Sequence, residues 1–174
     1  MPCSKQASSP LTYDGNGRTG RILNVLYLVQ QGLLDIPVLY LSRHILRTKG
    51  DYYRLLQSVR EADTWEEWVL YMLSAVEQCA REGVSTVTAI KAALLDVKHR
   101  IRSQHRFYSQ DLINTLFAHP YTKIDHIERD LGVSRLTATK YLEALTGSGF
   151  LRKKKMGRAN YYINVALNAI FNTN

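Results

Sequence analysis

The segment from Asp14 to Arg21 reads Asp-Gly-Asn-Gly-Arg-Thr-Gly-Arg and combines an acid, glycines and two arginines in front of an apolar run. Glycine tolerates positive φ, so we expect the backbone N–H groups around Gly15 and Gly17 to converge on an anion. Arg18 and Arg21 lie three residues apart, which places both guanidinium groups on one face of a helical turn. Asp14 would offer Mg²⁺ an oxygen ligand. The segment therefore predicts a site for nucleotide phosphates.

A helix is expected to position this loop. Apolar residues recur at helical spacing through residues 22–31, and Gly32 ends the run. The loop would then lie at a helix N-terminus, where unpaired N–H groups favour an anion. A hairpin turn at Asp-Gly or Asn-Gly is the alternative, but the following residues do not alternate as a strand would. A calcium-binding EF-hand loop is excluded because Arg18 occupies a position that needs an oxygen ligand.

The same residues resemble the second half of the Fic-domain signature, His-x-Phe-x-Asp/Glu-Gly-Asn-Gly-Arg-x-x-Arg, found in enzymes that transfer AMP from ATP to protein hydroxyls. The resemblance continues through residues 22–42 and 49–56. It implies ATP and Mg²⁺ as cofactors, a hydroxyl group of a target protein as acceptor, and a partial Fic-type helical core over residues 14–83. The residues it implies for the nucleotide are Gly15, Asn16, Gly17, Arg18, Thr19, Gly20, Arg21, Tyr52 and Arg60, with Asp14 for the metal. Tyr52 has an alternative interpretation as an interfacial aromatic on an amphipathic helix.

The first half of the signature is absent. Pro10 stands where the family has its catalytic histidine, and Thr12 stands where it has a phenylalanine. Proline cannot act as a general base, and the histidines of this chain all follow the motif. Residues 1–13 are predicted to be a disordered tail and are too few for the family's preceding helices and flap. We therefore expect a truncated protein that binds nucleotide weakly and transfers no AMP.

Charge is distributed unevenly along the 174 residues. Residues 1–97 hold ten Lys/Arg and ten Asp/Glu, whereas residues 98–174 hold thirteen Lys/Arg against five acids and so carry the whole net charge of +8. A basic C-terminal region points to a polyanionic partner. No apolar run has membrane-spanning length and no secretory signal is evident, so we expect a cytoplasmic protein without a membrane partner. Cys3 and Cys79 are predicted to be free thiols.

Between the motif and the basic region the pattern is helical. Ser42 is predicted to cap a short helix ending near Gly50, a second helix covers residues 50–61, and a capping box at residues 64–67 opens a third. The apolar stripe of this third helix is expected to be core: Trp65, Trp68, Val69, Met72, Leu73 and Val76. Gly83 is expected to break the chain. A connecting helix follows over residues 84–106, and its apolar seam is expected to pack on the preceding helix, with a homodimer as the alternative.

From residue 107 to residue 174 the order of elements resembles a winged helix-turn-helix. Helices are expected at 109–118, 122–131 and 135–146, with a turn at 132–134 and a wing of two strands at 150–154 and 160–164. The predicted fold class is thus mainly α, with a two-stranded β wing. Duplex DNA is the expected partner, and a protein-interaction module is the alternative. The candidate contacts are Arg135, Leu136, Lys140, Arg152, Lys153, Lys154, Lys155 and Arg158.

Overall fold

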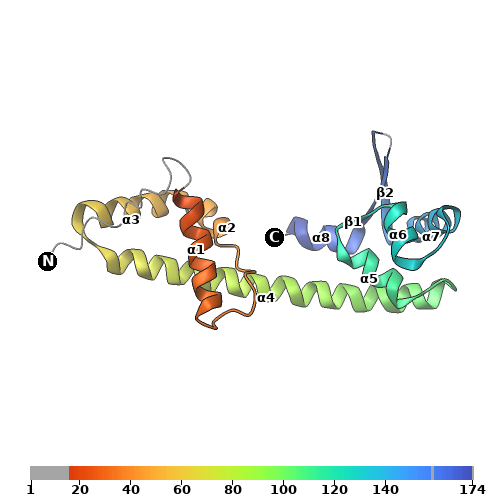
Figure 1. Cartoon of the computed structure of the whole chain (residues 1–174), viewed down its shortest axis with the longest axis horizontal. Coiled ribbons are helices and arrows are strands. Elements are labelled where there is room, and N and C mark those ends of the chain that lie inside the picture. The colour runs from red at the N-terminus through yellow and green to blue at the C-terminus, as the bar shows by residue number, and fades with distance from the viewer. Residues whose placement is uncertain (1–15, 158, 174) are drawn as a thin grey trace. The chain divides into compact units, whose positions relative to one another are not determined.

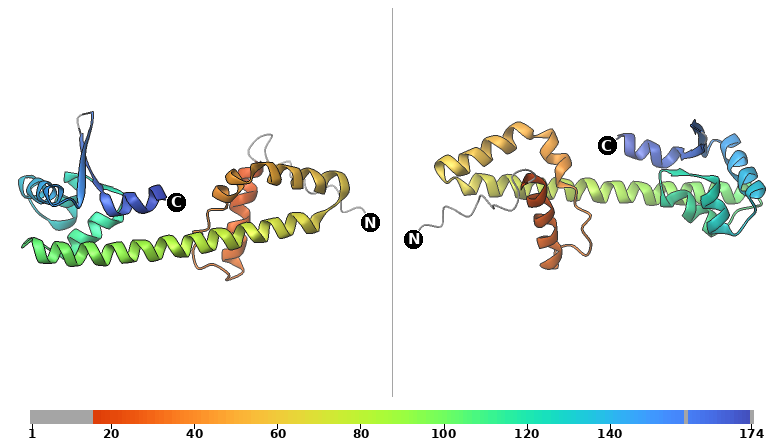
Figure 2. Two further views of the ribbon diagram at one scale, coloured as in Figure 1. Left: turned by 180° about the vertical axis from the view of Figure 1, so that it is seen from behind. Right: turned by 45° about the horizontal axis from the view of Figure 1, so that its top comes forward.

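The protein is mainly helical with one small antiparallel sheet (Figures 1 and 2), as the sequence predicted. The structure, a computed structural model, describes residues 16–157 and 159–173. The chain divides into two compact units, residues 1–84 and 85–174, which we describe separately. Helix α4 (Trp65–Gln104) contributes to both units. In the described ranges, no helix combines the length and the apolar character that crossing a membrane requires.

The first unit begins with α1 (Asn16–Gln30), which starts earlier than the apolar run indicated. Gly17 is therefore helical, and it is absent from the described glycines with positive φ, so the expected loop conformation is wrong at this position. Helix α1 includes Gly17 and Gly20. The N–H groups in the first turn of a helix are unpaired, so they are available there without any residue in the left-handed conformation. Gly32 has a φ of 69° and follows the end of α1, as predicted.

The core of the first unit is built by α2 (Leu41–Arg47), α3 (Lys49–Ala62) and the beginning of α4. Its buried members are Leu41, Ile45, Tyr52 and Ala75. Ser42 lies inside α2 instead of capping it, because Tyr40 occupies the N-cap position and makes no side-chain cap bond. Helix α1 contributes Val25 to this core, whereas Ile22, Leu23 and Leu26 are at least half exposed.

Helix α4 differs from its prediction in two ways. Gly83 does not break it, since one glycine inside a helix costs only about 1 kcal/mol. The expected core stripe is divided: Trp68, Met72 and Val76 pack on the core, but Trp65, Val69 and Leu73 are exposed by 48%, 48% and 59%. The division follows from the position of α2 and α3, which supply the buried members of this core besides Ala75.

The second unit uses the remainder of α4 as part of its own core. Val97 and Ile101 are buried there, and Leu94 packs against them. The expectation that the apolar seam packs on the preceding helix is therefore wrong for these residues. Val87, at the other end of the seam, is 65% exposed.

The other elements of the second unit are α5 (Gln110–Ala118), β1 (Tyr121–Thr122), α6 (Ile124–Leu131), α7 (Arg135–Gly147), β2 (Leu151–Met156), β3 (Ala159–Asn164) and α8 (Val165–Thr173). The three predicted helices and the two strands are present in the predicted order. Ser134 caps α7 by accepting a hydrogen bond from the N–H of Thr137, and Gly132 ends α6 with a φ of 65°. These two residues build the tight turn between α6 and α7 that the sequence predicted.

Two features of this unit were not predicted. Strand β1 adds a third strand, so the sheet has the antiparallel order β1-β3-β2 in place of a two-stranded wing. Helix α8 then follows β3, with Leu167 buried and Ala166 against the core. Strand β1 has only two residues, and such a strand is defined by its pairing partner rather than by a pattern of its own. The β2–β3 hairpin extends beyond the helices of its unit (Figure 1).

Candidate functional site

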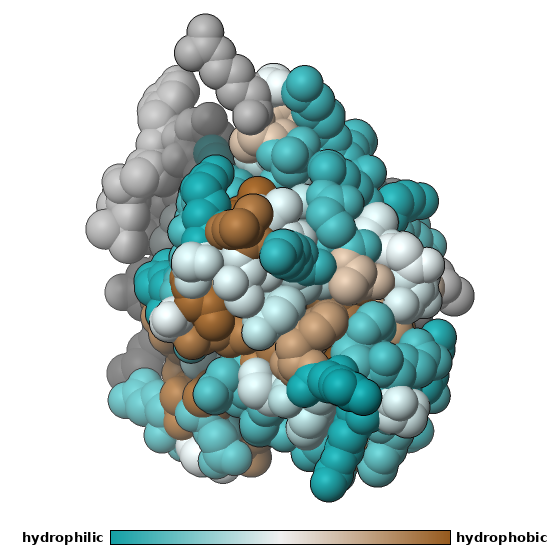
Figure 3. Space-filling view, turned by 90° about the vertical axis from the view of Figure 1, so that its right-hand side faces the viewer, coloured by the Kyte–Doolittle hydropathy of each residue, from teal (hydrophilic) through white to brown (hydrophobic). Residues whose placement is uncertain are grey.

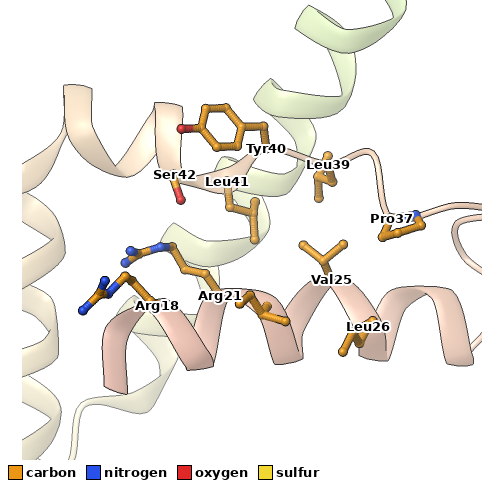
Figure 4. A pocket seen from close by; sticks show the side chains of 10 residues that line it. Arg18, Arg21, Val25, Leu26, Pro37, Leu39, Tyr40, Leu41 and Ser42 are labelled. Carbon is orange, nitrogen blue, oxygen red and sulfur yellow. The ribbon is translucent and has the colours of Figure 1, made fainter. Parts of the chain in front are cut away.

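A pocket in the first unit joins α1 to the segment that leads into α2. Its volume is about 390 Å³, and its lining residues are Arg18, Arg21, Ile22, Val25, Leu26, Pro37, Leu39, Tyr40, Leu41 and Ser42. Figure 4 shows the guanidinium groups of Arg18 and Arg21 at one end, on the side of Ser42, and apolar side chains toward Pro37 and Leu26. The pocket is thus cationic at one end and apolar along the rest.

The two arginines are placed by the helix, as their spacing predicted. Arg18 is exposed and Arg21 is half-buried. Among the described residues, no carboxylate forms an ion pair with either guanidinium group. Gly17 lies beside Arg21, since a Cβ at position 17 would be 3.5 Å from Nη1 of Arg21. Within the described residues, the donors of both guanidinium groups are therefore not occupied by a carboxylate at this end of the pocket.

The structure does not bring the other predicted nucleotide residues to this pocket. Tyr52 is 9% exposed, and its ring centroid lies 5.2 Å from that of Trp68 and 6.3 Å from that of Tyr71. Arg60 is exposed on α3, and neither it nor Thr19 lines the pocket. The interfacial aromatic interpretation of Tyr52 fits this placement better than contact with a nucleotide in the pocket. Asp14, Gly15 and Pro10 lie outside the described residues.

No histidine among the described residues lines the pocket. His44 comes closest in sequence, because α2 also carries Leu41 and Ser42. Its side chain is nevertheless buried, at 8% exposure, with its ring centroid 5.6 Å from that of Tyr71. The pocket as described therefore has arginines for phosphate but no imidazole for proton transfer. Sequence reasoning missed Ser42 as a pocket residue because its position was interpreted as a helix cap.

A second candidate surface lies on α7 and the β2–β3 hairpin. Helix α7 buries Ala138, Leu142 and Leu145 and exposes Lys140 and Leu136, the latter by 68%. The face of the molecule in Figure 3 is mostly hydrophilic with small apolar areas between. An exposed leucine beside basic side chains is compatible with contact to a thymine methyl group.

Arg135 is less available than its sequence suggested. Its Nη1 donates to Oδ1 of Asp125 at 2.8 Å and to Oε2 of Glu128 at 3.3 Å. The hydrogen bond and charge of Asp125, followed by the charge of Glu128, raise the pKa of the Arg135 guanidinium. A phosphate would have to compete with two carboxylates for this side chain, so Arg135 is a weaker contact than the hairpin cations.

On the hairpin, Lys153 is also paired. Its Nζ donates to Oε1 of Glu143 at 2.5 Å, and the hydroxyl of Tyr162 donates to the same oxygen at 2.8 Å. The bonds from Lys153 and then Tyr162 lower the pKa of the Glu143 carboxyl, while burial, followed by Glu143, raises the pKa of Tyr162 to about 12. Lys153 therefore ties the hairpin to α7.

The other described cations of the hairpin form no such ion pair with a described carboxylate. Arg152, Lys154 and Lys155 are exposed, and within residues 16–157 and 159–173 no carboxylate pairs with them. Arg158 lies outside the described residues. These three side chains form the unpaired cationic part of the hairpin.

The first unit is helical and has a pocket that is cationic at one end, and the second unit carries exposed basic side chains on its hairpin. Comparison with known families identifies the second part: residues 94–167 match the family described as protein adenylyltransferase SoFic-like, C-terminal domain. This match covers less than half of the chain and is consistent with the predicted resemblance to the C-terminal portion of a Fic-domain protein. The match begins in α4 and does not reach residues 14–21, whose role stays a prediction.

Metal binding has no support from clusters of side chains. Across the part of the chain that the structure describes, no group of three or more His, Cys, Asp or Glu residues could hold an ion. The proposed Mg²⁺ ligand, Asp14, is not in that part. The arginine end of the pocket fits an anion, and the metal remains an expectation from the resemblance.

Proposed function

We propose that the first unit binds the phosphates of a nucleotide, with ATP as the expected ligand, and that this chain transfers no AMP by itself. The observation that carries the proposal is the pair Arg18 and Arg21 at one end of an otherwise apolar pocket. Guanidinium groups bind phosphate oxygens through charge-assisted hydrogen bonds, and apolar walls suit a purine ring. The volume of about 390 Å³ falls in the usual range of small-molecule pockets.

The proposed lack of transfer rests on the missing base. Activation of a protein hydroxyl needs a group that accepts its proton, and the described pocket offers two arginines, a serine and the hydroxyl of Tyr40 for polar contacts. Asp14 with Mg²⁺ would supply further charge neutralisation of the phosphates when bound. That contribution changes affinity for the nucleotide without supplying a proton acceptor. The cytoplasm remains the proposed compartment.

Arg18→Ala and Arg21→Ala are each expected to weaken binding of ATP with Mg²⁺ about tenfold or more, since a hydrogen bond to a charged group contributes about 1.5–3 kcal/mol. Isothermal titration calorimetry measures this directly. Arg81→Ala on α4 is the matched control, because this arginine is exposed and contacts Glu77 alone among the carboxylates of the described residues. Labelled ATP added with a cell lysate should give no AMP-modified protein that depends on this chain. Equal affinities for the variants and the wild type, or clear labelling, would contradict the proposal.

We also propose duplex DNA as a ligand of the second unit, acting as a winged helix-turn-helix with α7 in the major groove. The favouring observation is the unpaired hairpin cations Arg152, Lys154 and Lys155 in the region that carries the whole net charge. In the proposed complex, the basic side chains of the wing would contact phosphates, and the exposed Leu136 and Lys140 on α7 would contact base edges. An autoregulatory role at the protein's own promoter is one use of such binding.

Binding to duplex DNA is expected to fall about 40-fold between about 50 and about 200 mM salt if the three unpaired hairpin cations each neutralise one phosphate. Lys154→Ala combined with Lys155→Ala should lower the slope of log affinity against log salt by about two. Fluorescence anisotropy with a labelled duplex measures both quantities. Lys49→Ala combined with Lys91→Ala is a matched control, since both lysines lie on helices outside the hairpin. An affinity for the duplex that does not change with salt concentration, or an equal decrease in slope for the Lys49 and Lys91 control, would exclude duplex DNA as a ligand of the hairpin.

A further inference from the structure

The three-stranded sheet has one face in the core and one face toward solvent. The strand register separates the two faces. Tyr162 pairs with Thr122 on one side and with Lys153 on the other, and these three side chains lie on the core face. Side chains of the adjacent pairs lie on the other face, because neighbouring positions along a strand alternate: Tyr121–Ile163, Arg152–Ile163 and Lys154–Tyr161. Thr122 and Tyr162 are 1% and 0% exposed. The opposite face, which we call the solvent face of the sheet, consists of Tyr121, Lys123, Arg152, Lys154, Tyr161 and Ile163.

Two tyrosine rings and three cations meet on this solvent face. The ring centroids of Tyr121 and Tyr161 lie 5.4 Å apart at an angle of 65°. Lys123 Nζ lies 4.7 Å from the ring centroid of Tyr161. Tyr121 is 43% exposed, a large fraction for an aromatic residue within a sheet. The aromatic pair is therefore open to solvent and surrounded by positive charge.

The charges of this face are uncompensated. Lys154 is the cross-strand partner of Tyr161, and Arg152 is that of Ile163, so both cations stand directly beside the aromatic pair. No described carboxylate pairs with Lys123, Arg152 or Lys154. Glu143, the acid that does contact the hairpin, is bonded to Lys153 and Tyr162 on the core face of the sheet. The face thus attracts an anion while offering exposed rings.

Unpaired nucleotides match this chemistry better than a duplex does. Each base of a single strand has a π-face that stacks on an aromatic side chain, and the phosphates follow a cationic surface. In a duplex the base faces are covered by their neighbours, so only edges and phosphates can be contacted. An acidic peptide would use the cations but would gain nothing specific from an exposed tyrosine pair.

We propose that the solvent face of the sheet binds single-stranded nucleic acid, with Tyr121 and Tyr161 stacking on bases and Lys123, Arg152 and Lys154 contacting phosphates. This site is distinct from the α7 surface proposed for duplex DNA, although the two share hairpin cations. It does not depend on the pocket of the first unit. Either DNA or RNA supplies the required chemistry, and separate probes distinguish them.

The test uses the full chain and fluorescein-labelled twelve-nucleotide strands of thymidine or uridine, with a labelled duplex beside them. Tyr121→Ala is expected to weaken single-strand binding about tenfold and to leave duplex binding unchanged. Tyr121→Phe keeps the ring and should keep the affinity. Lys140→Ala on α7 should show the reverse pattern, weakening the duplex alone. Tyr53→Ala removes an exposed tyrosine of α3, at 57% exposure, and is the matched control that should affect neither probe.

A direct readout of stacking completes the experiment. In Tyr121→Trp, the added indole should be quenched by the single strand beyond any change in the wild-type emission, which comes from Trp65 and Trp68 of the first unit. Unlabelled polyglutamate should not displace the strand. The proposal is overturned if Tyr121→Ala binds like the wild type, if the emission of the added indole is indifferent to the strand, or if polyglutamate competes as well as nucleic acid.

Discussion

Tyr162→Ala is expected to destabilise the second unit by about 3–5 kcal/mol, whereas Tyr161→Ala, one position away, should cost about 1 kcal/mol or less. Tyr162 is fully buried in the middle strand of the sheet, against the core that includes Ile127 and Leu142. Tyr161 points to solvent from the same strand. The two variants remove the same atoms, so the difference between them isolates burial.

Loss of the Tyr162 hydroxyl adds a second cost. This hydroxyl donates to Glu143, which also accepts from Lys153, so the bond ties β3 to α7 and the hairpin. Tyr162→Phe keeps the ring and removes this one bond, and it should cost about 1 kcal/mol. The difference in unfolding free energy between Tyr162→Phe and Tyr162→Ala then measures the loss of the buried ring, and we expect it to be about 2–4 kcal/mol.

Hydrogen exchange of peptides from residues 107–164 measures this loss in the unit concerned. The tryptophans of the chain, Trp65 and Trp68, lie in the first unit, so their emission during unfolding serves as an internal control that should not change. A larger loss of protection for Tyr161→Ala than for Tyr162→Ala would contradict the strand register, because a slip of one residue exchanges the two faces of β3. Equal losses would contradict the difference in burial.

The sequence was most informative where local signals and packing agreed. Ser134 and Gly132 fixed the turn between α6 and α7, and the helical spacing of apolar residues from residue 107 onward gave the helices in their observed order. These features depend on short-range geometry: a side chain that caps, a glycine at positive φ, and a period of 3.6 residues. Such signals can be recognised in the sequence without knowledge of distant contacts.

Predictions failed where a tertiary partner decides the outcome. Strand β1 exists because β3 pairs with it, and nothing in Tyr121 or Thr122 alone indicates this. Arg135 and Lys153 were expected to contact DNA, but both form ion pairs with acids on neighbouring elements and are therefore less available. For the pocket, the spacing of Arg18 and Arg21 predicted their common end, but the helical backbone of Gly17 and the participation of Ser42 required the structure.

The chain is expected to self-associate at micromolar concentration through apolar side chains of the first unit. On α1, Ile22, Leu23, Leu26 and Tyr27 are 50–61% exposed, and on α4 a stripe of Trp65, Val69, Leu70 and Leu73 is 48–59% exposed. Single exposed apolar residues are common, but contiguous stripes on two helices of one small unit exceed what monomeric proteins usually tolerate in water. Each such side chain gains about 25 cal/mol per Å² when an apolar surface covers it.

Val69→Glu combined with Leu73→Glu places two charges on the α4 stripe and should shift the chain toward its monomer mass of 19.9 kDa. Multi-angle light scattering across a concentration series measures that mass. Ser74→Glu combined with Gln78→Glu is the matched control, because it adds the same charges at the same spacing to exposed polar positions of α4 and leaves the stripe intact. The control should associate like the wild type, since charge alone does not remove the apolar surface. A wild-type chain that stays monomeric throughout the series would show that these stripes are tolerated in water, and the energetic argument for association would then fail.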